Sequence, residues 1–368
     1  MPRWFARLPA WIQERLSLAG LCLVAVGLLA GPAWAVDIAP DLQAALAMKN
    51  AGERVPVLMV FQNPLRDKSF LDGLADLDPV ARRRLVVDSL KDRALRENQA
   101  VRATLAAATL RGEVDRVREL YLAGAIMFEA DAAGVAAVAA LPEAATLHHD
   151  PPRDLTSAAR INEGPVMTKS ADEVVWNLQQ VSVPRVWSEL GITGAGVVVG
   201  HIDSGVMLAH SDLENRLWIN PGEIPDNGID DDGNGFVDDI HGYDFGDGDG
   251  NPDDDSRNGG HGTHTAGTIV GDGTGGLATG VAPGAKLMVT KVYRTDGGGG
   301  SLGSIWAAQQ YCVENGARVL SMSLVLSGNI PITFLRSERF NAENIRDAGV
   351  TFFNSAGNEF LFAEPPFE

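Results

Sequence analysis

Three short segments carry side chains that are suited to nucleophilic catalysis. Asp203 ends the apolar run at 197–202 and precedes a Ser-Gly turn, a place where a carboxylate can be buried and fixed. His261 stands among small residues at the start of a helical pattern. A neutral imidazole there can take a proton from a hydroxyl nucleophile when a carboxylate orients its other nitrogen. Asn358 follows an apolar run and a Ser-Ala-Gly segment, and its side-chain amide can donate to a developing oxyanion.

Each of these residues, taken alone, also has a plainer interpretation. Asp203 is compatible with a turn-forming role, and an Asn directly after Gly, as at Asn358, is usually a turn residue. His261 and His264 stand three positions apart on the expected helix, a spacing compatible with zinc, although no Cys or Glu completes such a ligand set. The three segments therefore gain weight only in combination.

In combination and in this order, the segments resemble those of the subtilisin-like serine proteases. The similarity extends from about residue 174 to the end of the chain and includes Gly-Val-Ala-Pro at 280–283 and Ser-Met-Ser-Leu at 321–324. The resemblance implies a triad in the order Asp, His, Ser, with an Asn in the oxyanion hole. It assigns Asp203 to orienting the imidazole, His261 to the general base, Asn358 to the oxyanion donor and His264 to a structural role.

The resemblance also implies two extended segments that pair with the backbone of a protein or peptide substrate. These are Gly297, Gly298 and Gly299 on one side, and Ser323, Leu324 and Val325 on the other. The family usually has Gly-Gly after its Ser-Leu, whereas Val325 and Leu326 stand at those places here. Branched side chains at these places are expected to narrow or reshape the pocket for the residue before the scissile bond.

The nucleophile is the part of the family pattern that these residues do not contain. It should lie in a Gly-Thr-Ser-x-Ala segment well after Asn358, and no Gly-Thr-Ser occurs among the 368 residues. We therefore expect this chain alone to have little or no proteolytic turnover, and we expect it to be a fragment of a longer gene product. The alternative is a catalytically inactive protease that retains the groove and acts as a peptide-binding or inhibitory protein.

The spacing of apolar runs predicts the elements that position these residues. Strands are expected at 197–202, 286–292, 318–323 and 350–354, and helices at 261–270, 301–315 and 341–348. This alternation predicts an α/β fold, a parallel sheet with helices on both faces, whose functional groups gather at the carboxyl ends of the strands. We expect residues 174–368 to form the N-terminal part of a subtilisin-like peptidase domain, with the fold incomplete.

Residues 36–150 are rich in Ala, Leu, Val and Arg and predict a separate, small α+β domain. Strands are expected at 55–61, 121–130 and 144–149, and helices at 81–107 and 131–141. The second half of this segment resembles a subtilisin-type propeptide, which implies an intramolecular chaperone and inhibitor that is cleaved between His149 and Val174. The alternative is an unrelated accessory domain. Residues 151–173 begin with Pro-Pro and predict an exposed linker.

The negative charge of the chain is concentrated in one segment. The formal net charge is −18, from 30 Lys and Arg against 48 Asp and Glu. Residues 226–255 contain 12 Asp and no Lys or Arg, so the rest of the chain carries −18 + 12 = −6. This balance argues against nucleic acid or an anionic membrane surface as the main partner.

The acidic segment opens with the D-x-D-x-N-G pattern of a calcium loop at 230–235. The twelfth position is His241 and not Glu, which excludes an EF-hand, but hard oxygen ligands still favour Ca²⁺ as a structural cofactor. By resemblance, Asp212, nine residues after Asp203, matches a calcium ligand of the family. The candidate ligands are Asp212, Asp230, Asp232, Asn234, Asp238 and Asp272. The alternative is a solvated acidic surface loop.

Residues 1–35 predict a secretory signal peptide. Three arginines precede the apolar run at 16–30, and Ala-Trp-Ala at 33–35 supplies the cleavage site. A run of this length rises about 22 Å as a helix, short of the ~30 Å hydrocarbon core. We expect a secreted, extracellular or periplasmic protein without stable membrane association, and an uncleaved signal anchor is the alternative. The two cysteines, Cys22 and Cys312, exclude a disulfide framework.

Overall fold

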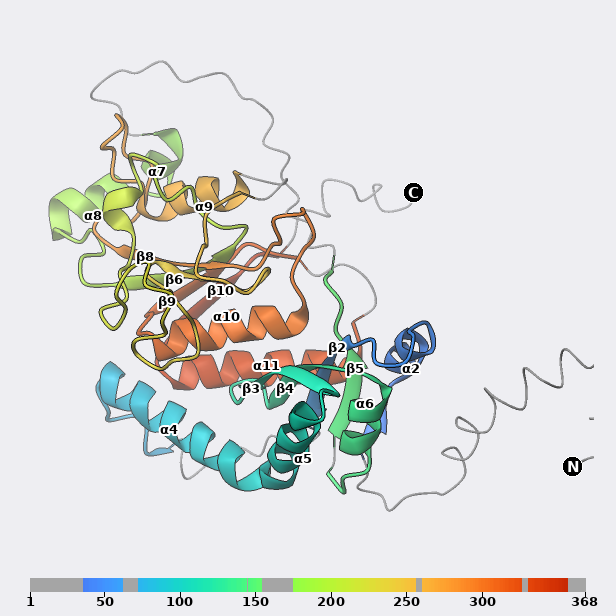
Figure 1. The fold of residues 1–368 in the computed structure, drawn as a ribbon. Helices are drawn as coiled ribbons and strands as arrows, with labels where there is room; N and C mark the ends of the chain where they lie inside the picture. The colour runs from blue at the N-terminus through green and yellow to red at the C-terminus, as the bar shows by residue number, and fades with distance from the viewer. Residues whose placement is uncertain are drawn as a thin grey trace, which may run out of the picture.

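The computed structural model describes residues 36–61, 72–143, 145–153, 175–255, 260–325 and 330–356. Two five-stranded sheets lie on opposite sides of helices α10 (Leu302–Glu314) and α11 (Ile332–Asp347), as Figure 1 shows. One sheet belongs to residues 36–153, called here the N-terminal unit, and the other to residues 175–356, called the parallel-sheet unit.

The sheet of the parallel-sheet unit has the strand order β10-β9-β6-β8-β7, and every neighbouring pair is parallel. Its strands are β6 (Val198–Asp203), β7 (Gly242–Asp244), β8 (Lys286–Lys291), β9 (Val319–Met322) and β10 (Thr351–Asn354). The α/β fold with a parallel sheet is therefore confirmed. Four of these strands lie within one residue of their predicted ends, because each is an apolar run bounded by turn residues.

Helices cover both faces of this sheet. On one face, Val199, Leu287 and Val289 pack with Ala266 and Val270 of α9 (His261–Val270). On the other face, alternate residues of the same strands pack against α10 and α11. The close approach of α10 requires Gly200 in β6, because a Cβ at this position would lie 2.6 Å from the Sγ of the buried Cys312. Two short helices, α7 (Trp176–Gln180) and α8 (Val183–Leu190), precede β6.

The N-terminal unit folds around a mixed sheet with the order β1-β5-β2-β4-β3. Its elements are β1 (Asp37–Ile38), α2 (Pro40–Ala47), β2 (Val55–Phe61), α4 (Pro79–Glu97), α5 (Gln99–Leu110), β3 (Val114–Leu120), β4 (Ala125–Ala130), α6 (Ala132–Ala139) and β5 (Ala145–His149). All neighbouring strands are antiparallel except β1 and β5, which are parallel. This unit is a small α+β fold, as predicted.

The two units share a hydrophobic core. Along β2, Val57 and Met59 face the unit's own helices α2, α5 and α6. The alternate residues Leu58 and Val60 pack against α10 and α11, together with Trp306 and other side chains of these helices. The sheet of the N-terminal unit is thus covered on one face by its own helices and on the other by helices of the parallel-sheet unit.

Three predicted elements of the chain differ from the structure. The helix expected at 81–107 is two helices, α4 and α5, separated at Asn98. The strand expected at 121–130 is only β4, and β3 was not predicted, because as an edge strand it exposes the residues of its charged middle. Helix α11 begins at Ile332, earlier than predicted, because it buries polar side chains such as Asn341 and so lacks a simple apolar pattern.

Some predictions fall on residues outside the described ranges. These are the signal peptide at 1–35, nearly all of the linker at 151–173, and Asn358. Within the ranges that the structure covers, no helix combines the length and the apolar character needed to cross a membrane.

Candidate functional site

The fold brings Asp203 and His261 into direct contact. Asp203 is the last residue of β6, and His261 is the first residue of α9, which packs on the same strand. The Nδ1 atom of His261 lies 2.6 Å from Oδ1 of Asp203, and both side chains are buried. A carboxylate in this position fixes the orientation and the tautomer of the imidazole.

Glycine at position 262 makes this contact possible. A Cβ on Gly262 would lie 2.0 Å from the carbonyl oxygen of Gly205, in the turn that follows Asp203. The helix therefore starts against the backbone of this turn. The residue before His261, Gly260, caps the helix with a φ of 96°. This left-handed conformation is one that glycine adopts without steric cost. The small residue at position 262 thus has a packing function.

Neighbouring side chains complete the hydrogen bonds of Asp203. Oδ1 also accepts from the backbone N–H of Ser204 (2.7 Å), and Oδ2 accepts from the hydroxyl of Thr265 (3.1 Å). The Thr265 hydroxyl also lies 2.9 Å from Nε2 of the buried His201. Neither Thr265 nor His201 was among the predicted site residues. The signal was the second Thr of the His-Gly-Thr-His-Thr segment, one helical turn after His261.

The hydrogen bond to Asp203 raises the pKa of His261 above its ordinary value, although burial acts in the opposite direction. Among the described residues, no hydrogen bond reaches Nε2 of His261. This atom is the one that a general base would offer to a hydroxyl nucleophile.

Nearby serines in the described part of the chain have structural hydrogen bonds. The Ser204 hydroxyl donates to Asp254 and accepts from the backbone N–H of Gly262. The Ser355 hydroxyl donates to the carbonyl of Leu324. Both hydroxyls hold backbone segments in place, and neither residue lies in a Gly-Thr-Ser motif.

The two predicted substrate-pairing segments lie at the carboxyl ends of β8 and β9. Residues 297–299 form a turn in which the Gly298 carbonyl accepts from the N–H of Arg294 (2.7 Å), and Gly299 forms an antiparallel bridge with Tyr293. In the other segment, which follows β9, Ser323 and Val325 are half-buried and Leu324 is buried.

The end of the N-terminal unit reaches the first of these segments. The backbone N–H of Arg153 donates to the carbonyl of Gly300, next to residues 297–299 (3.2 Å). Three residues earlier, the buried carboxylate of Asp150 accepts from the N–H groups of Leu302 (3.0 Å) and Gly303 (2.9 Å) in the first turn of α10. Asp150 therefore satisfies N–H groups that the helix leaves without partners. The sequence analysis did not single it out.

The acidic segment forms a loop between Asn220 and Asp239, called here the acidic loop. The carboxylates of Glu223, Asp230 and Asp232 converge, each offering an oxygen within 4.8 Å of the others. Two of the predicted ligands, Asp230 and Asp232, belong to this group, and Glu223 was missed because it precedes the motif by seven residues.

The remaining candidate ligands in the acidic loop have other partners. The Asn234 amide donates to Asp232 and Asp239, and its oxygen accepts from the N–H of Phe236. Asp238 lies apart from the converging group, since its two oxygens accept from the N–H groups of Asn227 and Gly228.

Asp212 and Asp272 lie close together in a different part of the parallel-sheet unit. Asp212 accepts from the N–H of Gly275 (2.5 Å), and its carbonyl accepts from the N–H of Asp272 (3.2 Å). Asp272 forms an ion pair with Arg216 (3.1 Å). The exposed His264 lines a cavity of about 480 Å³ beside Asp212, whereas His261 faces Asp203. In the described part of the chain, the two histidines do not gather into a metal-binding group.

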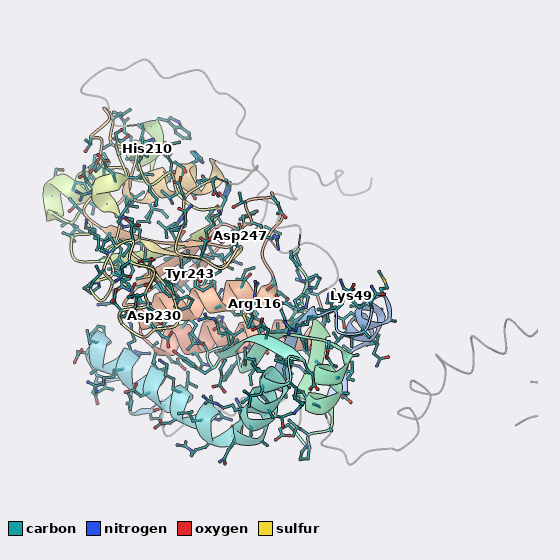
Figure 2. All side chains as sticks on the ribbon, in the orientation of Figure 1. Lys49, Arg116, His210, Asp230, Tyr243 and Asp247 are labelled. Carbon is teal, nitrogen blue, oxygen red and sulfur yellow. The ribbon has the colours of Figure 1, made fainter. Side chains whose placement is uncertain are left out.

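Figure 2 shows how these places are distributed over the molecule. Asp230 and Tyr243 lie on the side of the parallel-sheet unit that is directed toward the N-terminal unit. His210, which lines the same cavity as Asp212, lies at the opposite end, near α7. The acidic loop and the Asp212 region are therefore separate places.

The buried Asp–His pair lies at the carboxyl edge of the parallel sheet, and in this arrangement the carboxylate can orient the imidazole. Comparison with known proteins shows which family this part of the chain resembles. The model of the Subtilase family matches residues 194–364, which include both Asp203 and His261. Residues 194–364 thus match the subtilase family, and the predicted subtilisin-like fold is confirmed.

Several relatives carry the same kind of domain. The chain is 33% identical over 227 residues to bacillopeptidase F of Bacillus subtilis (strain 168), covering 59% of this chain and 15% of that protein. It is 30% identical over 189 residues to the major intracellular serine protease of the same organism, covering 51% and 50%. A crystal structure of a cold adapted subtilisin-like serine proteinase aligns with a TM-score of 0.32 at 25% identity, over 46% of this chain and 49% of that one. The chain thus spans half or less of the lengths of these proteins.

Proposed function

We propose that this chain is part of a secreted subtilisin-like serine endopeptidase that is made as a zymogen. The observation that carries the proposal is the 2.6 Å contact between Asp203 and His261 in a region that matches the subtilase family. His261 would act as the general base through Nε2, and Asp203 would orient it and stabilise the imidazolium. Asn358, which lies outside the described residues, is proposed as the oxyanion donor by resemblance.

The proposal needs a serine that the 368 residues do not supply in the family's Gly-Thr-Ser motif. We propose that the nucleophile is encoded beyond this sequence and joins Nε2 of His261 in the complete protein. Protein or peptide substrates would lie between residues 297–299 and 323–325, pairing through the backbone as an added strand.

The N-terminal unit is proposed to be the propeptide and intramolecular inhibitor. Two contacts support this role: Arg153 bonds to Gly300 beside one substrate-pairing segment, and Asp150 binds the first turn of α10. A chain segment in this place would lie beside the backbone groups that a substrate is proposed to pair with. The shared core with α10 and α11 also suits a unit that assists folding.

Calcium is proposed as a structural cofactor, and the signal peptide at 1–35 is proposed to direct secretion to the extracellular space or periplasm. The acidic loop supports the calcium proposal, because a carboxylate oxygen of the buried Glu223 has no hydrogen-bond partner there. When bound, the ion would neutralise and cross-link the acidic loop; no chemical step of hydrolysis passes through it.

The test is to sequence the gene past codon 368 and to express the complete reading frame. We expect a Gly-Thr-Ser segment, peptide hydrolysis, and covalent labelling of one serine by a fluorophosphonate, with labelling lost in a His261→Ala variant. A stop codon directly after Glu368 would overturn hydrolysis by this protein. Peptide-binding and protease-inhibition assays would then test the inactive alternative.

A further inference from the structure

One carboxylate of the acidic loop, that of Glu223, has an oxygen without a hydrogen-bond partner among the described residues. Glu223 is only 8% exposed. Its Oε1 accepts from the backbone N–H groups of Asp231 (2.9 Å) and Asp232 (3.2 Å). Its Oε2 is buried and has no hydrogen-bond partner. A buried, unpaired carboxylate oxygen is costly, so this atom points to a ligand that the described residues do not provide.

Two further carboxylates meet Glu223 at this place. Oxygens of Glu223, Asp230 and Asp232 lie within 4.8 Å of one another. Three like charges at this separation repel unless a cation lies between them, and oxygen-only ligands suit Ca²⁺. The site is next to the part of the loop that touches the N-terminal unit.

The contact with the N-terminal unit is made by Arg118, on β3. Its guanidinium lies 4.0 Å from the ring centre of Phe236 and donates to the carbonyl of Gly235 (3.3 Å). Both of these acceptors belong to the acidic loop, directly after the D-x-D-x-N segment. Arg118 is half-buried in this contact.

The converging carboxylates also hold the backbone that Arg118 contacts. The two oxygens of Asp230 accept from the N–H groups of Asn234 (3.0 Å) and Gly235 (2.8 Å). The same peptide segment therefore has its N–H groups on the carboxylate side and its Gly235 carbonyl on the Arg118 side. A cation that fixes Asp230 also fixes the acceptor of Arg118.

We propose that Glu223, Asp230 and Asp232 bind a divalent cation, and that binding is thermodynamically coupled to the seating of the N-terminal unit through Arg118. The cation orders the acidic loop in the conformation that receives Arg118, and the seated Arg118 in turn favours the cation-binding conformation. This deepens the calcium part of the proposed function and does not depend on peptide hydrolysis. A negative result in the peptidase assay would therefore not contradict the proposed cation site or its coupling to the N-terminal unit.

The site itself is tested by titrating the full chain, freed of metal, with Ca²⁺ in a calorimeter. A Glu223→Gln variant should bind Ca²⁺ at least about tenfold more weakly than the wild type, because it loses a ligand charge. The matched control is Asp238→Asn, in the same loop but outside the converging group, and it should bind within about twofold of the wild type. If Glu223→Gln does not fold by circular dichroism, Asp230→Asn takes its place. Wild-type affinity in the folded ligand variant would overturn the site.

The coupling is tested by an Arg118→Ala variant, for which two explanations predict opposite signs. By electrostatics alone, removal of a positive charge near a cation site should tighten Ca²⁺ binding. Coupling predicts weaker binding, by about fivefold, although Arg118 is not a ligand. Arg102→Ala removes the same charge from the N-terminal unit at an ion pair with Glu119 and should leave the affinity unchanged. Equal or tighter binding in Arg118→Ala would overturn the coupling and leave the site in place.

Discussion

The Asp203–His261 pair and the Glu223–Asp230–Asp232 group are both built on a buried carboxylate that accepts backbone N–H groups. They differ in whether both oxygens of the buried carboxylate have hydrogen-bond partners. Both oxygens of Asp203 have partners, from His261, Ser204 and Thr265. Glu223 retains one oxygen without a partner. The first centre is therefore preorganised by the protein alone, whereas the second is completed by an ion under our proposal.

The largest expected effect on stability comes from a substitution that disturbs the backbone beside the Asp203–His261 pair. A Gly262→Ala substitution places a methyl group 2.0 Å from the Gly205 carbonyl, so α9 must move away from β6. We expect a loss of about 3 kcal/mol in the free energy of unfolding, measured by urea denaturation.

The control for this substitution is Gly267→Ala in the same helix. The nearest atom to a Cβ there is Thr279 Oγ1 at 3.7 Å, an ordinary contact. We expect unchanged or slightly higher stability, by up to about 1 kcal/mol, because Ala favours a helix over Gly. Equal losses in both variants would mean that α9 does not depend on close packing at Gly262.

The acidic group is tested by removing and restoring calcium. With Ca²⁺ at about 100 times its dissociation constant, we expect the wild type to gain about 2.7 kcal/mol over the metal-free chain. Differential scanning fluorimetry in EDTA and in excess Ca²⁺ measures this difference as a shift in Tm. Glu223→Gln should lose most of the shift, whereas a full shift in that variant would contradict the role of Glu223.

An intermediate effect is expected from Asp203→Asn, which removes the charge beside His261. Because Asp203 raises the pKa of His261, this pKa should be lower in the variant than in the wild type, as measured by NMR titration of the ring proton. In the wild type, the pair stabilises the fold fully below the unfolded pKa of about 6.5, and this contribution is lost as pH rises through the higher folded pKa. The variant should lack that pH dependence. An unchanged His261 titration would contradict the assigned hydrogen bond.

The smallest expected effect is that of Thr265→Val, which removes the contacts of this hydroxyl with Asp203 and His201 and leaves the Asp–His contact. We expect about 1 kcal/mol of destabilisation by chemical denaturation and a smaller change in the pKa of His261 than in Asp203→Asn. A change as large as that of Asp203→Asn would show that the Thr265 hydroxyl, and not Asp203 itself, sets the orientation of the imidazole.

The sequence allowed the parallel-sheet unit to be predicted in detail because its strands are continuous apolar runs, such as β6 and β8, bounded by turns. Asp203 and His261 could be paired because the order of their segments resembles that of the subtilisin-like serine proteases. The partners that complete the sites were not predictable in the same way. Arg118 and Asp150 act across the boundary between the two units, and contacts between distant segments leave no local spacing in the sequence.

The packing of α10 against Gly200 makes Cys312 a built-in reporter of global opening. Its thiol is fully buried between the helix and β6, and burial raises its pKa to about 12. The reactive thiolate is therefore scarce in the folded chain. A thiol reagent should modify Cys312 only while α10 is away from the sheet. When α10 recloses faster than the reagent reacts, the labelling rate relative to that of an exposed thiol gives the free energy of this opening.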